Sequence, residues 1–176
     1  MGGIQSSFET RYVIGGRVPY RYLAGTTLVT TFVVMILGSY TGAIGAGLSC
    51  PDWPTCYGTV VPFLDPQIIQ SSPYTPLQIF AEWIHRGLAM VAGFMILGTA
   101  LAAWRVQRDN PIVRWSAILA LLLLPFQVVL GGLTVTEQLD PFVVTAHLAV
   151  ASLILVMLTA TYVGSMVLVG KDTRFG

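Results

Sequence analysis

Four long apolar stretches constrain the fold of this chain more than any other feature. They cover residues 22–46, 77–104, 115–136 and 141–170. Each is long enough to cross a bilayer as a helix, which takes about 20 mainly apolar residues. Only 10% of the 176 residues are charged, whereas soluble domains carry about 25%. We therefore predict an all-α membrane protein, a four-helix transmembrane bundle that forms a single domain over residues 1–176.

Positive charges predict how the four spans are oriented in the cell membrane. Eight of the nine Lys and Arg residues lie before the first span, between the second and third, or after the fourth, and residues 47–76 and 137–140 contain none. By the positive-inside rule, both termini are predicted to be cytoplasmic. The start of the chain contains Glu9, Arg11 and Arg17 but no apolar run, so the first span is expected to be its own signal anchor. A net charge of +1 argues against a nucleic-acid partner.

The connection over residues 47–76 is long and is extracytoplasmic in this topology. Its prolines and aromatic residues favour a folded loop on the membrane surface, and connections of this length are usually functional or disordered. Cys50 and Cys56 lie in it with five residues between them. Because this compartment is oxidising, we predict a disulfide, which either staples the loop or takes part in redox chemistry. Residues 65–70 are predicted to form a short interfacial helix.

Two short segments indicate an internal repeat. Residues 36–41 read ILGSYT near the end of the first span, and residues 129–134 read VLGGLT near the end of the third. Each is followed by an outer connection and then by a span with one histidine near its outer end, His85 or His147. We therefore predict two pseudo-repeated helical hairpins, and repeats of this kind commonly place a shared site at their interface.

His85 and His147 are the only histidines of the chain, and both lie at membrane depth. At 1.5 Å of rise per residue, they are about 12 Å and about 9 Å from the outer ends of their spans. Ionisable residues inside spans are candidates for function, although a histidine can also simply hydrogen-bond between helices. A depth-matched imidazole pair suits the two axial positions of a heme iron. A zinc site takes about four ligands, and Glu82 would supply only a third, so we predict heme.

Two charged residues flank His85 in the segment EWIHR. Arg86 is the one positive charge in the outer half of a span, so it needs an anionic partner, which is either a heme propionate, Glu82 or an acid of the outer loop. Glu82 shares a helix face with His85. It either accepts protons during an oxidation or only pairs with Arg86. Gln127 and Thr134 share a face of the third span and are expected to hydrogen-bond between helices.

Four segments carry a resemblance to a known family. They are residues 42–58 with the motif CPDWPTC, residues 82–86 with EWIHR, residues 127–135, and residues 145–148 with TAHL. Together they resemble the heme A synthase family over all four spans. The resemblance implies an enzyme that oxidises a methyl group of heme O to a formyl group by successive hydroxylations. Its product, heme A, serves terminal oxidases.

The resemblance also assigns roles to individual residues. His85 and His147 match the axial heme ligands, and Glu82 matches an acidic residue implicated in catalysis. Cys50 and Cys56 match a pair of cysteines in the outer loop. Heme b is the implied cofactor, heme O the implied substrate, and heme O synthase an implied partner.

The chain departs from typical members of that family in its size. They have eight spans in two similar halves and four histidines, whereas this chain has four spans and two histidines. It therefore looks like a compact, half-size form, for which a homo-oligomer is expected. Two other functions stay open: a bis-histidine cytochrome b that only transfers electrons, and a heme-free assembly factor. The axial ligands and the space between the helices do not by themselves distinguish a substrate heme from a permanently bound one.

Overall fold

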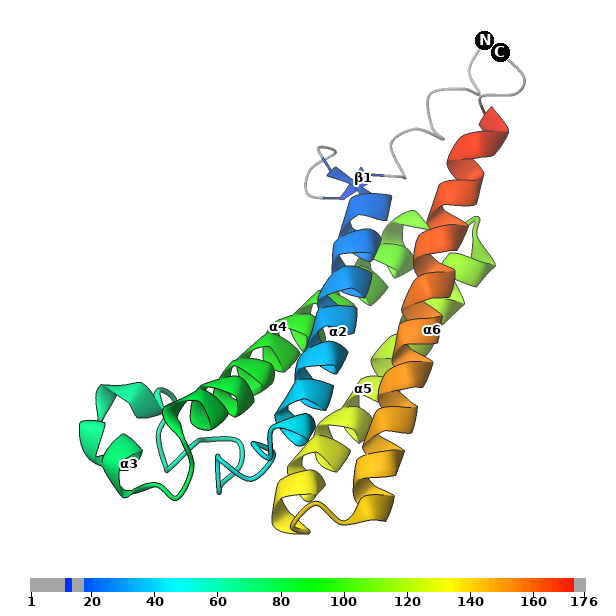
Figure 1. The fold of residues 1–176 in the computed structure, drawn as a ribbon. Helices are drawn as coiled ribbons and strands as arrows, with labels where there is room; N and C mark the ends of the chain where they lie inside the picture. Colours follow the sequence, from blue (N-terminus) through cyan, green and yellow to red (C-terminus); the bar gives the residue numbers. More distant parts are fainter. Residues whose placement is uncertain (1–11, 14–17, 173–176) are drawn as a thin grey trace. The chain divides into compact units, whose positions relative to one another are not determined.

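The structure is a computed structural model that describes residues 12–13 and 18–172 (Figure 1). Within these residues, four long helices account for most of the chain. They are α2 (Tyr20–Ala43), α4 (Pro76–Val106), α5 (Pro111–Thr136) and α6 (Pro141–Asp172). The shorter elements are β1 (Tyr12–Val13) and β2 (Val18–Pro19), which pair antiparallel, the 3-10 helix η1 (Pro62–Leu64), and the helix α3 (Pro66–Ser71).

The four long helices confirm the prediction of an all-α protein with four membrane spans. Each is long and apolar enough to cross a membrane, with a mean hydropathy of 1.6 to 2.3 in its most apolar part. The first helix ends at Ala43, before the predicted end at residue 46. The reason is Gly45, whose φ of +68° is a left-handed backbone conformation of the kind that ends helices. The short helix predicted in the outer loop is confirmed as α3.

The orientation of these helices in a membrane stays a prediction. Arg21 is described and lies in the first turn of α2, and Arg105 lies in the last turn of α4. The predicted orientation and signal anchor also rest on four residues that lie outside the described part of the chain. These residues are Glu9, Arg11, Arg17 and Arg174.

Proline determines where the helices after α2 begin. A residue that can cap a helix stands directly before a proline in four places, Asp65-Pro66, Thr75-Pro76, Asn110-Pro111 and Asp140-Pro141. Proline lacks an N–H group that would have no partner at this position anyway, and the preceding side chain accepts from free N–H groups of the first turn. Asp140 Oδ1, for example, accepts from the backbone N–H groups of Phe142 at 2.9 Å and Val143 at 3.1 Å. The local sequence therefore fixes these helix starts.

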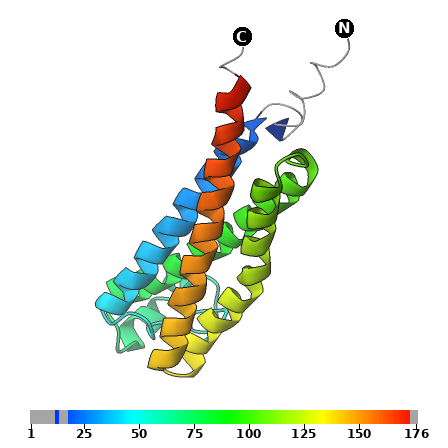
Figure 2. The same ribbon diagram turned by 90° about the vertical axis from the view of Figure 1, so that its right-hand side faces the viewer.

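The chain divides into two compact units, and each long helix contributes to both. Unit 1 comprises the described parts of residues 1–31, 92–124 and 152–176. Inside it, Thr27 Oγ1 and Thr99 Oγ1 lie 2.8 Å apart, and Gly25 of α2 faces the ring of Tyr162 of α6. Both views show these parts of α2 and α6 side by side (Figures 1 and 2). Small residues and hydroxyl pairs of this kind stabilise helix packing where lipid supplies no hydrophobic drive.

Unit 2 comprises residues 32–91 and 125–151 and contains every residue that the sequence assigned to a site. The outer loop has a small core of its own, formed by Cys50, Cys56 and Ile79 with aromatic residues packed around them. Trp83 of α4 belongs to this group, and its Nε1 donates to the backbone carbonyl of Val60 at 2.7 Å. The loop is therefore folded, as predicted, and packs against the first turns of α4; its place on the membrane surface stays a prediction.

Candidate functional site

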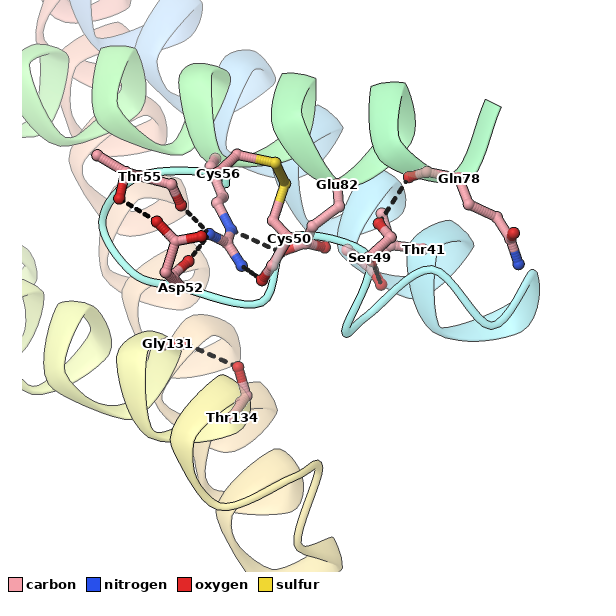
Figure 3. Close-up of polar contacts among 12 residues, drawn as sticks. Thr41, Ser49, Cys50, Asp52, Thr55, Cys56, Gln78, Glu82, Gly131 and Thr134 are labelled. Atoms are coloured by element: carbon pink, nitrogen blue, oxygen red, sulfur yellow. Dashed lines mark hydrogen bonds and ion pairs between the residues drawn. A yellow bond between two sulfur atoms is a disulfide. The ribbon is translucent and has the colours of Figure 1, made fainter. Parts of the chain in front are cut away.

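The predicted disulfide between Cys50 and Cys56 is confirmed. It joins two residues of the segment 50–58, here called the disulfide loop, and no more than 2% of either cysteine is exposed. Directly before this loop, the hydroxyl of Ser49 donates to the backbone carbonyl of Gln78 on α4 at 2.9 Å (Figure 3). The disulfide loop is therefore attached to the start of α4.

Asp52 organises the backbone inside the disulfide loop. Its carboxylate accepts hydrogen bonds from the hydroxyl of Thr55 and from the backbone N–H groups of Tyr57 at 2.6 Å and Gly58 at 2.9 Å. Burial on its own would raise the pKa of Asp52, but these hydrogen bonds favour the ionised form and hold the pKa below its usual value. The ionised carboxylate thus stabilises the fold of the loop.

Arg86 connects the disulfide loop to Glu82. Its Nε donates to Glu82 Oε1 at 2.8 Å. Its Nη1 donates to the backbone carbonyls of Asp52 at 2.6 Å and Thr55 at 2.8 Å, and its Nη2 donates to that of Cys50 at 2.9 Å. The sequence left three anionic partners open for Arg86: a heme propionate, Glu82 or an acid of the outer loop. Of these, the structure shows Glu82. The three loop carbonyls had no signal in the sequence.

Glu82 is a carboxylate buried in the outer part of α4. Only 6% of the residue is exposed, and Figure 3 shows it beside Cys50 and Ser49. Burying a charge is unfavourable unless a partner compensates it, and the guanidinium of Arg86 does so here. Glu82 precedes His85 by three residues, which places both on one helix face. A compensated, buried base therefore lies next to the first histidine.

Each histidine packs against a glycine of the preceding long helix. We call residues 32–91 the first hairpin and residues 125–151 the second hairpin. A Cβ atom on Gly38 would lie 2.9 Å from Cε1 of His85, and one on Gly131 would lie 3.2 Å from Cε1 of His147. At Gly38 an added methyl group would force the imidazole or the helix to move, whereas at Gly131 a small shift of the imidazole would be enough.

The carbonyl oxygens of the same two glycines each accept a hydrogen bond from a threonine. Thr41 Oγ1 donates to the carbonyl of Gly38, and Thr134 Oγ1 donates to the carbonyl of Gly131, both at 2.7 Å. Figure 3 shows the second of these contacts. Thr134 was expected to hydrogen-bond between helices, but its hydroxyl donates within its own helix. The two ILGSYT-like segments therefore present their glycines to the histidines with the same local contact.

The imidazoles have unsatisfied nitrogen atoms. Nδ1 of His85 and Nδ1 of His147 are buried and have no hydrogen-bond partner among the described residues. Nε2 of His147 lies 3.3 Å from Nε2 of Gln127 on α5, so Gln127 makes the interhelical contact that the sequence suggested for it. Buried polar atoms without partners are rare and call for an explanation.

Trp53 of the disulfide loop reaches the second hairpin. Its indole packs on Gly132 of α5, where an added Cβ would lie 3.3 Å from the ring. Gly132 is the neighbour of Gly131, which faces His147. This contact was not predicted from the sequence, although the sequence has a signal for it: VLGGLT has a second glycine where ILGSYT has Ser39. An additional glycine indicates that another group approaches the helix closely.

The predicted site residues thus form two groups inside unit 2. Glu82, Arg86 and the disulfide loop are joined by hydrogen bonds, and each histidine lies against its own glycine. The model of the family described as cytochrome oxidase assembly protein (COX15-CtaA) matches residues 21–173. The chain belongs to this family.

The relatives of this chain carry two kinds of name. A heme A synthase from Shewanella oneidensis is 36% identical over 135 residues, which are 72% of this chain and 40% of the relative. A heme A synthase from Geobacillus thermodenitrificans is 29% identical over 147 residues, 82% of this chain and 39% of the relative. A protoheme IX farnesyltransferase 1 from Natronomonas pharaonis is 32% identical over 132 residues, 73% of this chain and 26% of the relative.

The matched shares of the relatives limit which of their properties can be assigned to this chain. The chain spans about two fifths of the length of the heme A synthases that it matches. No solved structure is similar to it at a significant level. Two statements hold within these limits. The chain belongs to the family, and its four long apolar helices are those of a multi-pass membrane protein.

Proposed function

We propose that this chain is a heme A synthase that oxidises a methyl group of heme O to a formyl group by successive hydroxylations. The observation that carries the proposal is the pair of buried imidazoles, one against a glycine of each hairpin, with the carboxylate of Glu82 one helical turn from His85. Membership of the family and the names of the relatives support the choice of substrate.

The residues of the site fit a heme. Two imidazoles with unsatisfied buried nitrogen atoms are the donor set of a bis-histidine heme iron. His85 and His147 would hold the iron, and heme b is the proposed resident cofactor. When bound, the heme supplies an iron that changes its oxidation state and, in the substrate heme O, the methyl group that reacts.

Glu82 is the proposed catalytic residue. The oxidation of a methyl group with oxygen from water releases protons and electrons. The electrons would have to pass to an external acceptor, and a buried carboxylate next to the proposed heme ligand could accept protons. Arg86 holds Oε1 of Glu82, so Oε2 is the oxygen that accepts a proton. The hydrogen bonds of Arg86 to the loop keep the guanidinium, and with it the carboxylate, in one orientation.

Arg86 is also proposed to bind the heme. A guanidinium has five N–H groups. Nε uses one, Nη1 uses two and Nη2 uses one in the contacts with Glu82 and the loop carbonyls. The remaining N–H group of Nη2 can donate to a propionate that points outward.

The assembly of the protein is part of the same proposal. We propose that the two hairpins are a pseudo-repeat, that both termini are cytoplasmic, and that the protein lies in the plasma membrane as a homo-oligomer. Heme O synthase is the proposed partner that supplies the substrate. In the Natronomonas relative, the matched part is 26% of a protein named for the farnesylation of protoheme IX, so a segment like this chain is joined there to a longer protein.

The experiment that tests this function is pigment analysis. Membranes that contain this chain together with a supply of heme O are extracted, and their hemes are separated by chromatography. Heme A or its hydroxylated precursor is the expected product. Bound heme B or heme O that is never oxidised would contradict the enzymatic function and favour an electron carrier. Protein without any Soret band would contradict heme binding altogether.

A further inference from the structure

Arg114 of unit 1 is an arginine without an acidic partner among the described residues. It is the fourth residue of α5, and its Cζ lies 3.7 Å from the centre of the Trp104 ring on α4. Its Nε is buried without a hydrogen-bond partner, whereas Nη1 and Nη2 are not fully buried and have no partner among the described residues either. The indole therefore holds in place a planar set of donors that the described chain does not use.

The surroundings of Arg114 are positively charged as well. Residues 104–115, which join the end of α4 to the start of α5, contain three arginines and a single acid, Asp109. Arg105 and Arg108 are exposed, and neither forms an ion pair with a described residue. This part of unit 1 therefore carries an excess of positive charge that its own acid does not compensate.

A fourth arginine comes to the same end of unit 1 from α2. Tyr20 packs in one buried cluster with Ala103 of α4 and Val113 of α5, so the start of α2 lies at the same end as the connection between α4 and α5 (Figures 1 and 2). Arg21 follows Tyr20, and its Cζ lies 5.1 Å from the centre of the Tyr22 ring. Arginines beside Trp and Tyr at the ends of apolar helices are typical of the level of the lipid headgroups.

We propose that this end of unit 1 binds the phosphate of an anionic phospholipid, and that Arg114, stacked on Trp104, is the specific contact. A guanidinium donates paired hydrogen bonds to phosphate oxygens, and clusters of about four or more arginines next to a membrane helix attract anionic headgroups. Because 49% of Trp104 is exposed, a headgroup can approach the stacked pair. The inference requires only that the helices span a membrane, so it does not rest on the proposed function.

The test is native mass spectrometry of the purified full-length chain in detergent, titrated with phosphatidylglycerol or with zwitterionic phosphatidylcholine. The wild type is expected to retain phosphatidylglycerol more strongly. Arg114→Gln should weaken this binding about tenfold, the size of lost hydrogen bonds to a charged group. Arg108→Gln is the matched control, because it removes the same charge from an exposed arginine nearby, and it should change binding by at most about twofold.

A second pair of variants leaves the charge of the chain unchanged and tests the site even if Arg114→Gln does not fold. Trp104→Leu removes the ring that holds the guanidinium, so it should weaken the binding of phosphatidylglycerol about threefold, the size of one lost cation–π contact. Trp115→Leu removes another exposed tryptophan, which stacks on no arginine of the described residues, and should bind like the wild type.

Three results would overturn the inference. A wild type that holds both lipids alike would show no preference for an anionic headgroup. Equal losses in Arg114→Gln and Arg108→Gln, or in Trp104→Leu and Trp115→Leu, would show a diffuse charge rather than a site at Arg114. Displacement of phosphatidylglycerol by an equal concentration of inorganic phosphate would show that the ligand is free phosphate and not a lipid.

Discussion

The two hairpins hold their histidines in the same way but surround them with different chemistry. In both, a glycine lies against the imidazole and a threonine donates to the carbonyl of that glycine. Around His85, the helix carries Glu82 and Arg86, whereas the corresponding positions around His147 are Val144 and Leu148. Under the proposed function, the shared part holds the heme and the part that differs serves the reaction.

The connections of the two hairpins differ as well. The first has the disulfide loop, whose backbone carbonyls accept from Arg86. The second has a tight turn in which Gln138 and Leu139 take left-handed backbone conformations, with φ of 51° and 61°. Trp53 extends from the first connection to α5 of the second hairpin. Polar chemistry is therefore concentrated in the first hairpin, and the second contributes Gln127 beside its histidine.

Loss of a histidine is the change with the largest expected effect. His85→Ala and His147→Ala each remove one axial nitrogen, so each is expected to weaken heme binding at least about 10-fold and to turn a low-spin iron into a high-spin one. Heme titration with absorbance spectra measures both effects. Spectra and affinities like those of the wild type in both variants would remove the ligand assignment.

Glu82 tests whether the reaction belongs to the first hairpin. Glu82→Gln keeps the shape of the side chain but cannot accept a proton, so product formation is expected to fall by about 10² to 10⁴ while bound heme stays constant. Val144→Gln makes the corresponding change in the second hairpin and should leave product formation intact. Chromatography of extracted hemes gives both quantities. Equal losses in the two variants would show that position 82 has no special role.

The two glycines test how similar the hairpins are in packing. Gly38→Ala brings a methyl group to 2.9 Å from the His85 ring, and Gly131→Ala brings one to 3.2 Å from the His147 ring. Overpacking typically destabilises by about 1–3 kcal/mol, so Gly38→Ala should unfold at a clearly lower temperature and Gly131→Ala only slightly lower. Thermal unfolding in detergent measures this. A lower midpoint for Gly131→Ala than for Gly38→Ala would contradict the described packing.

Asp52 gives the smallest effect and concerns the first hairpin alone. Because its pKa is lowered in the fold, ionised Asp52 stabilises the disulfide loop above the usual pKa of an aspartate, and this is lost as the pH falls through the lower value of the folded state. The side chain is only partly buried, so solvent screens it and the effect should stay below about 1 kcal/mol. The protection of the loop amides against hydrogen exchange, relative to the intrinsic rate at each pH, should fall in the wild type as the pH decreases. Asp52→Asn should show lower protection near neutral pH and lose this dependence.

The helices, their starts and the two histidines could be predicted from the sequence, because they depend on local or compositional signals. Long apolar stretches require helices in a membrane, and the cap-and-proline pairs give their starts. His85 and His147 were found because each is the only histidine of its span. Arg86 was known to need an anionic partner, but its carbonyl partners depend on the path of the disulfide loop. The contact between Gln127 and His147 depends on the packing of two helices, which no local pattern encodes.

The most direct test of the central claim is electron paramagnetic resonance of the ferric, heme-loaded protein. If His85 and His147 bind one iron from both sides, the wild type should give a low-spin signal typical of two imidazoles. His85→Ala and His147→Ala should each replace that signal with a high-spin one. A wild-type spectrum dominated by high-spin iron, or a low-spin signal that survives the loss of either histidine, would contradict the account.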